Sequence, residues 1–340
     1  MQKITSAGAA TRVGRVRTGR AATGTMAGIH GNHPAALLPN GTVLVPGGYN
    51  NVSATTSSEI FNPASGTWST TASLKSPRYF HTTTVMPSGK VLITGGYNGV
   101  VATNSVEWFE ITNATWTVTN TLNVPRNSQT ATVLTNGKVL VTGGQNAGGG
   151  TNGTELFDPT AGTWTTSGSM AAPRFFHTAT LLGNGQLLVA GGQSSGGSAT
   201  NGAELYDAGG GTWANTSALN IAHHSHTATL LLNGKVLVSG GTNSTGNLTS
   251  AELYDPANGS WTPTKVLNAA RSSHSATLLI NGKVLLAGGF ASGGTTNGTE
   301  LYDVGLGFTN IWQLRAVGGA AACKTAGEQN LAVDEQGRGM

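Results

Sequence analysis

The sequence is poor in the residues that most often carry chemistry. Its 340 residues include one cysteine, Cys323, which lies outside the repeats described below, so the repeats have no disulfide and no thiolate ligand for a metal. Charged residues make up only 9% of the chain, against about 25% in an average soluble protein. No apolar run approaches the roughly 18 residues of a membrane span. The first thirty residues lack the apolar segment of a secretory signal peptide. We therefore expect no membrane association.

The basic balance of the chain is confined to its N-terminal end. Residues 1–29 hold five basic residues and no acidic ones, residues 30–303 hold ten basic and eleven acidic residues, and residues 304–340 hold three of each. A nucleic-acid-binding protein would instead carry a basic stripe on its folded surface. We therefore expect no nucleic-acid partner, although the net charge is +4.

What the sequence has in quantity is a repeated glycine pair. The pairs begin at Gly47, Gly95, Gly143, Gly191, Gly240 and Gly288. Each follows an Asn-Gly or similar turn and a short apolar run, as in Asn136 to Gly144. The pairs are 48 or 49 residues apart, and a fixed period of this length indicates an architecture of stacked repeats.

One unit of the repeat contains four predicted strands, which we call a, b, c and d. In the middle of the chain they are 177–182 (a), 186–190 (b), 203–207 (c) and 212–214 (d), with turn residues between them. Short strands separated by turn signals predict an antiparallel meander. Such a sheet cannot cover both of its faces alone, whereas blades packed around an axis bury them. We therefore predict an all-β fold, a six-bladed propeller of four-stranded antiparallel blades.

The repeat also predicts the domain limits. The propeller should span 23–313, with blades starting near residues 33, 81, 129, 177, 226 and 274, between a basic N-terminal arm (1–22) and a non-repeat tail (314–340). The abrupt loss of pattern raises the hypothesis of a truncated end. The fourth strand of the last blade could be 307–313 or an N-terminal latch at 18–25, and the register of Met26 favours the latch.

The order of residue types within the unit resembles the kelch repeat. The pattern is Pro-Arg-x-x-His, Gly-Gly, Glu-x-Tyr-Asp-Pro and Gly-Thr-Trp, and it recurs over residues 23–312. The chain looks most similar to bacterial kelch chains that resemble the propeller domain of galactose oxidase. The resemblance implies a protein-binding platform, an oxidase scaffold or a sugar-handling enzyme, and the fold alone does not choose between them.

Most acidic and aromatic residues fall into columns that serve the blades. One glutamate recurs in all six units, and a second acidic or Asn column ends strand c, where it caps a turn. No carboxylate of the propeller is left for a two-carboxylate hydrolase. The Phe/Tyr and Trp columns should form the core between blades.

The eight histidines lie in one short region of the repeat. His33, His81, His177, His226 and His274 share a column, with Gln129 in the third blade. Equivalent positions on different blades are spread around a ring, whereas zinc needs ligand nitrogens at roughly 2.0–2.1 Å. We therefore expect no metal, and histidines that pack against the glycine pair and bond to the backbone.

A binding site is expected where two kinds of loop meet. The connections from strand d to the next strand a and the loops from b to c leave a meander on the same side, and the b–c loops are the most variable part of the repeat. Arginine on a d–a connection could hold carboxylates, as the resemblance implies for kelch domains that bind acidic peptides. The alternative is that it pairs with the glutamate column. The candidate ligand-binding residues are Arg78, Arg126, Arg174, Arg271, His30, His223, Tyr49, Tyr97 and Phe290.

These observations favour a non-catalytic binding or scaffold propeller whose ligand is a protein or a glycan. A copper radical oxidase of the galactose oxidase type needs a cysteine, which the propeller lacks. The alternatives are a kelch-type carbohydrate-active enzyme similar to a sialic-acid isomerase, and a structural module of a larger secreted protein. We expect no catalytic residue, no cofactor, a monomer, and an extracellular or cell-surface location, otherwise a cytoplasmic one.

Overall fold

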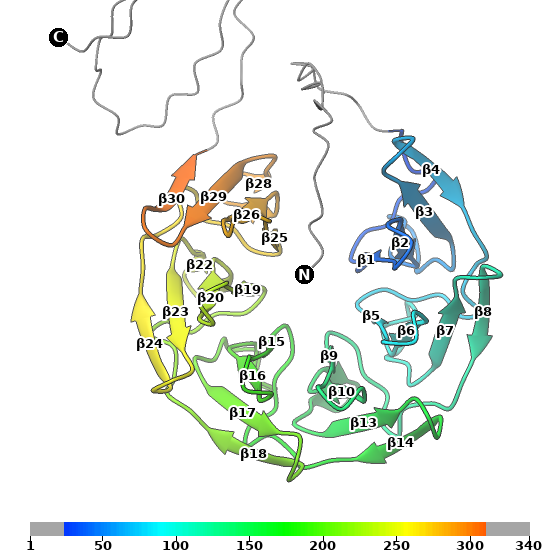
Figure 1. The fold of residues 1–340 in the computed structure, drawn as a ribbon, viewed down its shortest axis with the longest axis horizontal. Helices are drawn as coiled ribbons and strands as arrows, with labels where there is room; N and C mark the ends of the chain where they lie inside the picture. The colour runs from blue at the N-terminus through cyan, green and yellow to red at the C-terminus, as the bar shows by residue number, and fades with distance from the viewer. Residues whose placement is uncertain (1–23, 311–340) are drawn as a thin grey trace, which may run out of the picture. The chain divides into compact units, whose positions relative to one another are not determined.

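Six four-stranded antiparallel sheets form the blades of a β-propeller (Figure 1). A computed structural model describes residues 24–310, which contain strands and turns but no helix, and hence none that could span a membrane. The predicted fold class is confirmed.

Each blade runs from its inner strand a to its outer strand d. Blade 1 has β1 (Ala36–Leu37), β2 (Val43–Pro46), β3 (Ser58–Asn62) and β4 (Thr67–Thr70). Blade 2 has β5 (Thr82–Val85), β6 (Val91–Thr94), β7 (Val106–Glu110) and β8 (Thr115–Val118). Blade 3 has β9 (Thr130–Val133), β10 (Val139–Thr142), β13 (Thr154–Asp158) and β14 (Thr163–Thr166). Blade 4 has β15 (Thr178–Leu181), β16 (Leu187–Ala190), β17 (Ala203–Asp207) and β18 (Thr212–Asn215). Blade 5 has β19 (Thr227–Leu230), β20 (Val236–Ser239), β23 (Ala251–Asp255) and β24 (Ser260–Pro263). Blade 6 has β25 (Ser275–Leu278), β26 (Val284–Ala287), β29 (Thr299–Asp303) and β30 (Gly307–Asn310).

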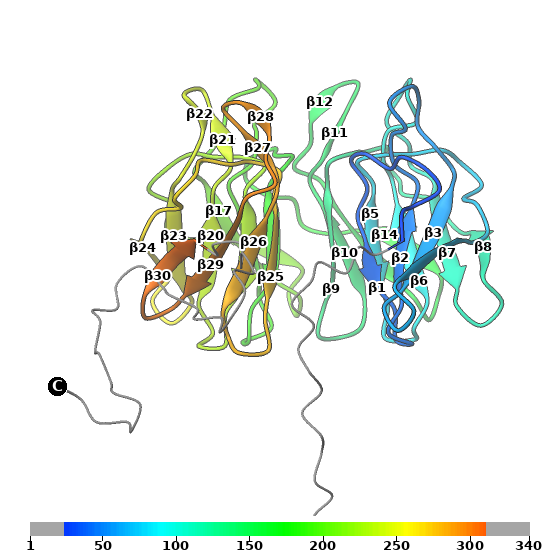
Figure 2. The same ribbon diagram turned by 90° about the horizontal axis from the view of Figure 1, so that it is seen from above.

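In three blades the b–c loop forms an additional two-stranded ribbon. The ribbons are β11 (Gln145–Asn146) with β12 (Gly149–Gly150), β21 (Thr242–Asn243) with β22 (Gly246–Asn247), and β27 (Phe290–Ala291) with β28 (Gly294–Thr295). All three project on the same side of the ring (Figure 2). We call this side, which carries the d–a connections and b–c loops, the ligand face.

The Asn-Gly turn and the glycine pair fix each a–b hairpin for different reasons. Asn136 accepts a hydrogen bond from the Lys138 amide at 3.1 Å, and Gly137 has a φ of 79°, which glycine adopts without strain. At the end of strand b, a side chain on Gly143 would place its Cβ 2.4 Å from the Arg174 carbonyl oxygen of the next blade. The pair is therefore glycine because two backbones meet there.

Apolar side chains from neighbouring blades form the core. Strand b is buried along its whole length in blades 2 to 5. Five hydrophobic clusters join consecutive blades, and each includes the buried Phe or Tyr of strand c from the later blade. The neighbouring tryptophan ties the blades further, as where Trp213 Nε1 donates to the Gly168 carbonyl of the preceding unit at 2.8 Å. The aromatic columns are thus core residues.

The last blade completes itself with its own fourth strand. β30 pairs with β29 over four residues, and Phe308 packs against Tyr302 with ring centroids 4.9 Å apart, in the place of the missing tryptophan. This corrects the preference for an N-terminal latch, whose residues 18–23 lie outside the described part of the chain.

Within residues 24–310, the ring of blades is open between its first and last members. Figure 1 shows blades 1 and 6 on either side of an open sector. The five clusters join blade 1 to 2, 2 to 3, 3 to 4, 4 to 5 and 5 to 6, and within residues 24–310 no cluster joins blade 6 to blade 1.

Candidate functional site

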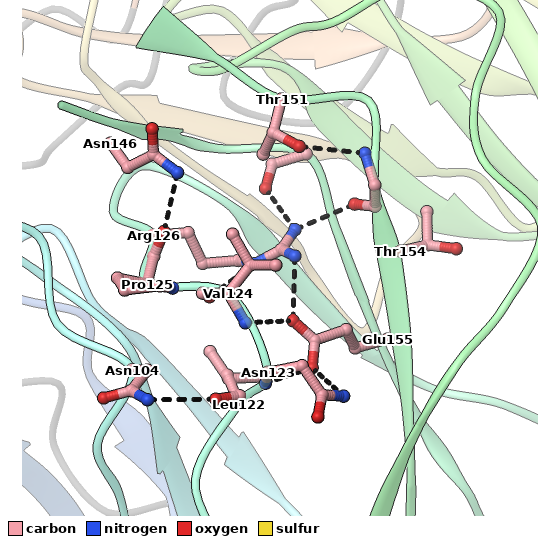
Figure 3. A network of polar contacts seen from close by, with 12 residues as sticks. Asn104, Leu122, Asn123, Val124, Pro125, Arg126, Asn146, Thr151, Thr154 and Glu155 are labelled. Atoms are coloured by element: carbon pink, nitrogen blue, oxygen red, sulfur yellow. Dashed lines mark hydrogen bonds and ion pairs between the residues drawn. The ribbon is translucent and has the colours of Figure 1, made fainter. Parts of the chain in front are cut away.

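The arginines of the d–a connections face the interior of the blades. Arg126 Nη1 donates to the Gly143 and Gly153 carbonyl oxygens, both at 2.8 Å, and its Nη2 donates to Glu155 Oε1 at 2.9 Å (Figure 3). The carboxylate in turn accepts from the Asn123 amide at 2.6 Å and the Val124 amide at 3.1 Å. Burial lowers the pKa of Arg126, and Glu155 opposes that shift. The Arg126–Glu155 ion pair therefore links the d–a connection to strands b and c by hydrogen bonds.

The same network recurs in three other blades. Arg78, Arg174 and Arg271 are at most 2% exposed and bind Glu107, Glu204 and Glu300 at 2.6–2.8 Å. This burial corrects the expectation that the four guanidinium groups reach an anionic ligand, because their Nη atoms already donate to glutamate and backbone carbonyl oxygens inside the protein. Pairing with the glutamate column, the alternative from the sequence, is what the structure shows.

The two histidines of this column are also buried. His30 replaces arginine in blade 1, where its Nε2 lies 3.1 Å from Glu59 Oε1. His223 of blade 5 is fully buried, and neither of its ring nitrogens forms a hydrogen bond of normal geometry with the described residues. Burial lowers the pKa of His223 to about 4, against a smaller opposing effect of the Gly240 carbonyl. Neither histidine faces a ligand, which corrects that part of the prediction as well.

The main histidine column stabilises the contact between neighbouring inner strands. His177 is buried, and its Nε2 lies 3.0 Å from Thr130 Oγ1 of the preceding blade. The partner of His177 Nε2 is thus a side-chain hydroxyl, whereas His33 Nδ1 of the same column bonds to the His30 carbonyl oxygen, the kind of backbone acceptor that the sequence predicted. Burial lowers the pKa values of His81 and His177 to about 3, so both rings are neutral at neutral pH. Among the described residues no group of three His, Cys, Asp or Glu side chains could hold a metal ion.

A ring of strained backbone lies at the channel mouth. At one equivalent position of every blade a non-glycine residue has a φ of 51–56°: Asn32, Phe80, Ser128, Phe176, Ser225 and Ser273. Each amide after the first donates to the carbonyl of the equivalent residue in the preceding blade at 2.8–3.1 Å. This left-handed region suits asparagine but is unusual for a bulky residue. Such strain tends to occur at functional sites, so the two phenylalanines are notable.

An aromatic array extends from these phenylalanines across the ligand face. The ring of Tyr79 lies 5.3 Å from that of Tyr49, 5.5 Å from Tyr97 and 5.1 Å from Phe80, centroid to centroid. Phe80 lies 5.5 Å from Phe176. Blades 1, 2 and 4 therefore contribute one continuous set of partly exposed rings. Burial raises the pKa of Tyr79, so its hydroxyl stays protonated at neutral pH.

A cavity of about 380 Å³ lies beside this array, between blades 2 and 3. Tyr79, Phe80 and Tyr97 line one part of it, and the amide side chains of Asn127, Gln145 and Asn146 line another. Tyr97 is held by a hydrogen bond from its hydroxyl to the Val100 carbonyl at 2.9 Å. The site thus combines flat apolar rings with hydrogen-bonding amides.

The loops around the cavity carry no charge. The b–c loops of all six blades, residues 47–57, 95–105, 143–153, 191–202, 240–250 and 288–298, contain no Asp, Glu, Lys, Arg or His. The exposed Lys–Asp and Lys–Glu pairs, such as Lys138 with Asp158 at 3.0 Å, join the a–b and c–d turns at the other end of the strands. A ligand at this site would meet aromatic and amide groups without a formal charge.

The candidate residues from the sequence thus divide into two groups. The arginines and histidines are interior, whereas Tyr49 and Tyr97 belong to the aromatic array. Phe290 is 51% exposed on blade 6, away from the cavity. The sequence prediction missed Tyr79, Phe80 and Phe176. The sequence does contain a signal for them, because the two residues that follow the arginine column vary between blades, from Tyr79-Phe80 in blade 2 to Ser272-Ser273 in blade 6.

Comparison with known proteins identifies the repeat. The sequence model described as the KLHDC2/KLHL20/DRC7 Kelch-repeats domain matches residues 80–289, more than half of the chain. The chain belongs to this Kelch-repeat family. No curated protein matches it. Among solved structures, "Structure of YjhT" superposes on the Kelch propeller with a TM-score of 0.67 and 17% sequence identity, covering 82% of this chain and 96% of that one. At this identity the likeness concerns the fold alone.

Proposed function

We propose that this Kelch propeller is a non-catalytic binding module that holds an uncharged ligand, best a neutral glycan, in the cavity between blades 2 and 3. The observation that carries the proposal is the joint presence of Tyr79, Phe80 and Tyr97 with three amide side chains in one cavity. Aromatic faces pack against the apolar face of a sugar ring, and amides bond to its hydroxyl groups.

The volume of the cavity suits a small molecule, and the absence of charged residues in the b–c loops suits an uncharged one. A volume near 380 Å³ is at the lower end of small-molecule sites. The uncharged b–c loops offer neither the cations that would bind an acidic ligand nor the anions that would bind a basic one. An uncharged stretch of protein is the second candidate, since kelch propellers generally serve as protein-interaction scaffolds.

The arrangement of the acids favours binding over hydrolysis. The six glutamates of the repeated column are at most 2% exposed, and each accepts hydrogen bonds from the d–a connection beside it. Within residues 24–310 the other acids lie at the c–d turns, away from the ligand face. A glycosidase would need two carboxylates flanking one bond.

The proposal is tested with a panel of neutral oligosaccharides and a panel of uncharged peptides, at 50 and 500 mM NaCl. We expect a neutral oligosaccharide to bind with little dependence on salt, because no charged pair is formed. Tyr97→Ala should weaken binding by about tenfold, or roughly 1.4 kcal/mol. The matched control is Phe290→Ala, an aromatic at the same repeat position outside the cavity, which should bind normally. Binding confined to anionic ligands, or equal loss in both variants, would contradict the proposal.

A further inference from the structure

The two ends of the arc of blades expose surfaces that are buried at every other blade. In strand b, Leu285 is partly exposed, whereas its five equivalents, Leu44, Leu92, Leu140, Leu188 and Leu237, are at most 1% exposed. Leu279 is likewise partly exposed, while its equivalent Leu231 is 3% exposed. These leucines form the side of blade 6 that would meet a following blade.

The facing side of blade 1 shows the complementary exposure. Val43 is partly exposed, whereas its five equivalents, Val91, Val139, Leu187, Val236 and Val284, are fully buried. Phe61 is partly exposed, whereas the Phe or Tyr at its position in blades 2 to 6 is at most 1% exposed. In each complete interface, these residue types pack against the leucines of the preceding blade.

Among residues 24–310, backbone groups at the same two ends lack the partners that their equivalents have in the other blades. The second glycine of the pair donates to the next blade in blades 1 to 5, as Gly241 does to the Arg271 carbonyl at 2.8 Å, but Gly289 forms no such bond among the described residues. A Cβ on Gly240 would meet the Arg271 carbonyl at 2.6 Å, whereas one on Gly288 would meet only Thr296, at 3.6 Å. The hydrogen-bonded ring of left-handed residues also stops at Ser273 without returning to Asn32.

These gaps define the chemistry of what would fill them. The missing piece presents Val and Phe or Tyr side chains to blade 6 and Leu side chains to blade 1. It accepts a hydrogen bond from the Gly289 amide, and its own left-handed residue donates to the Ser273 carbonyl and accepts from Asn32. The smallest element that meets all of these demands is one more blade of the same repeat, because each of the five complete interfaces does so.

We infer that the open sector is a docking site for one further kelch-type blade from outside these 340 residues. The sequence beyond the described part does not carry the repeat. Its glycine pair, Gly318-Gly319, begins 30 residues after Gly288 instead of 48 or 49, and neither 1–23 nor 311–340 has an Asn-Gly turn followed by a strand and a glycine pair. Docking continues the established interfaces around the ring and buries apolar surface at both ends.

The first measurement is thiol labelling of the full chain with Cys323→Ser as background, which removes the single native cysteine. Leu285→Cys should react at least about tenfold faster than the matched Leu237→Cys, because labelling of a buried position requires local opening. Equal protection of the two would overturn the inference, since the chain would then cover its own edge. A doubled mass in sedimentation together with protection of Leu285→Cys would overturn it as well, because a second copy would then cover the edge.

The second measurement adds a polypeptide of residues 174–222, one complete repeat, as the probe. We expect it to protect both Leu285→Cys and Val43→Cys from labelling, in a saturable manner, and to leave the rate of Leu237→Cys unchanged. A scrambled polypeptide of the same composition should protect neither. No protection, or protection of one edge only, would show that the sector does not hold a blade. The proposed ligand cavity between blades 2 and 3 plays no part in either readout.

Discussion

The buried arginine–glutamate pairs allow a direct test of what the d–a connections do. Arg126→Ala removes three short hydrogen bonds, two to carbonyl oxygens at 2.8 Å and one to Glu155 at 2.9 Å. It leaves Glu155, which is 1% exposed, with backbone and Asn123 donors but no cation. Leaving a buried charge without its partner costs about 3–5 kcal/mol. Because domains are stable by only about 5–15 kcal/mol, the loss should be large.

Urea unfolding followed by tryptophan fluorescence measures this loss in the free energy of unfolding. The control is Lys138→Ala, whose ion pair with Asp158 is exposed, and it should leave stability nearly unchanged. Glu155→Gln and the double variant complete a cycle, in which the coupling isolates the pair from the other contacts. A single arginine is replaced because removal of all four would unfold the chain.

The result that refutes this reasoning is specific. If Arg126→Ala unfolded at the same urea concentration as Lys138→Ala but no longer bound ligand, the guanidinium group would act at the ligand face. We expect the opposite, a destabilised protein that binds normally under conditions where it remains folded.

Three further predictions concern the histidines and the strained ring. His81 has a pKa lowered to about 3 in the folded chain, so between pH 7 and 5 only the unfolded chain gains this proton and the fold loses about 2 kcal/mol. The variant His81→Gln copies Gln129 of blade 3, and its free energy of unfolding should fall by about 2 kcal/mol less than that of the native chain between pH 7 and 5. An identical dependence of the free energy of unfolding on pH in both proteins would contradict the burial of a neutral His81. His223→Arg should raise the free energy of unfolding by about 1 kcal/mol by supplying Glu252 with the cation that it lacks. A destabilised variant would show that the space occupied by the His223 side chain does not fit arginine. Phe80→Asn should change stability by no more than about 1 kcal/mol, because asparagine tolerates the left-handed backbone, yet weaken glycan binding, and unchanged affinity would remove Phe80 from the site.

Much of the fold could be predicted from the sequence because the repeat encodes it six times. A turn such as Asn136-Gly137, an apolar strand and a glycine pair act locally, so their positions predicted the hairpins and the number of blades. The structural role of the glutamate column and the core position of the aromatic columns were also predicted correctly, because a residue type present in every blade has a role in the structure of the blade. The fourth strand of blade 6 was not predicted correctly, because Gly307 and Phe308 depart from the repeat pattern and an N-terminal strand was preferred in their place.

The sequence by itself determined the blades, and the tertiary structure decided which side chains reach solvent. Arg78 and Tyr79 are neighbours on one d–a connection, yet Arg78 is buried against Glu107 and Tyr79 lines the cavity. The sequence assigns them to adjacent columns but does not say which column faces solvent, because the direction of a side chain depends on the strands of the same and neighbouring blades. The open sector is a tertiary property for the same reason, since the curvature of the ring arises from five blade–blade contacts and is not written in any single repeat.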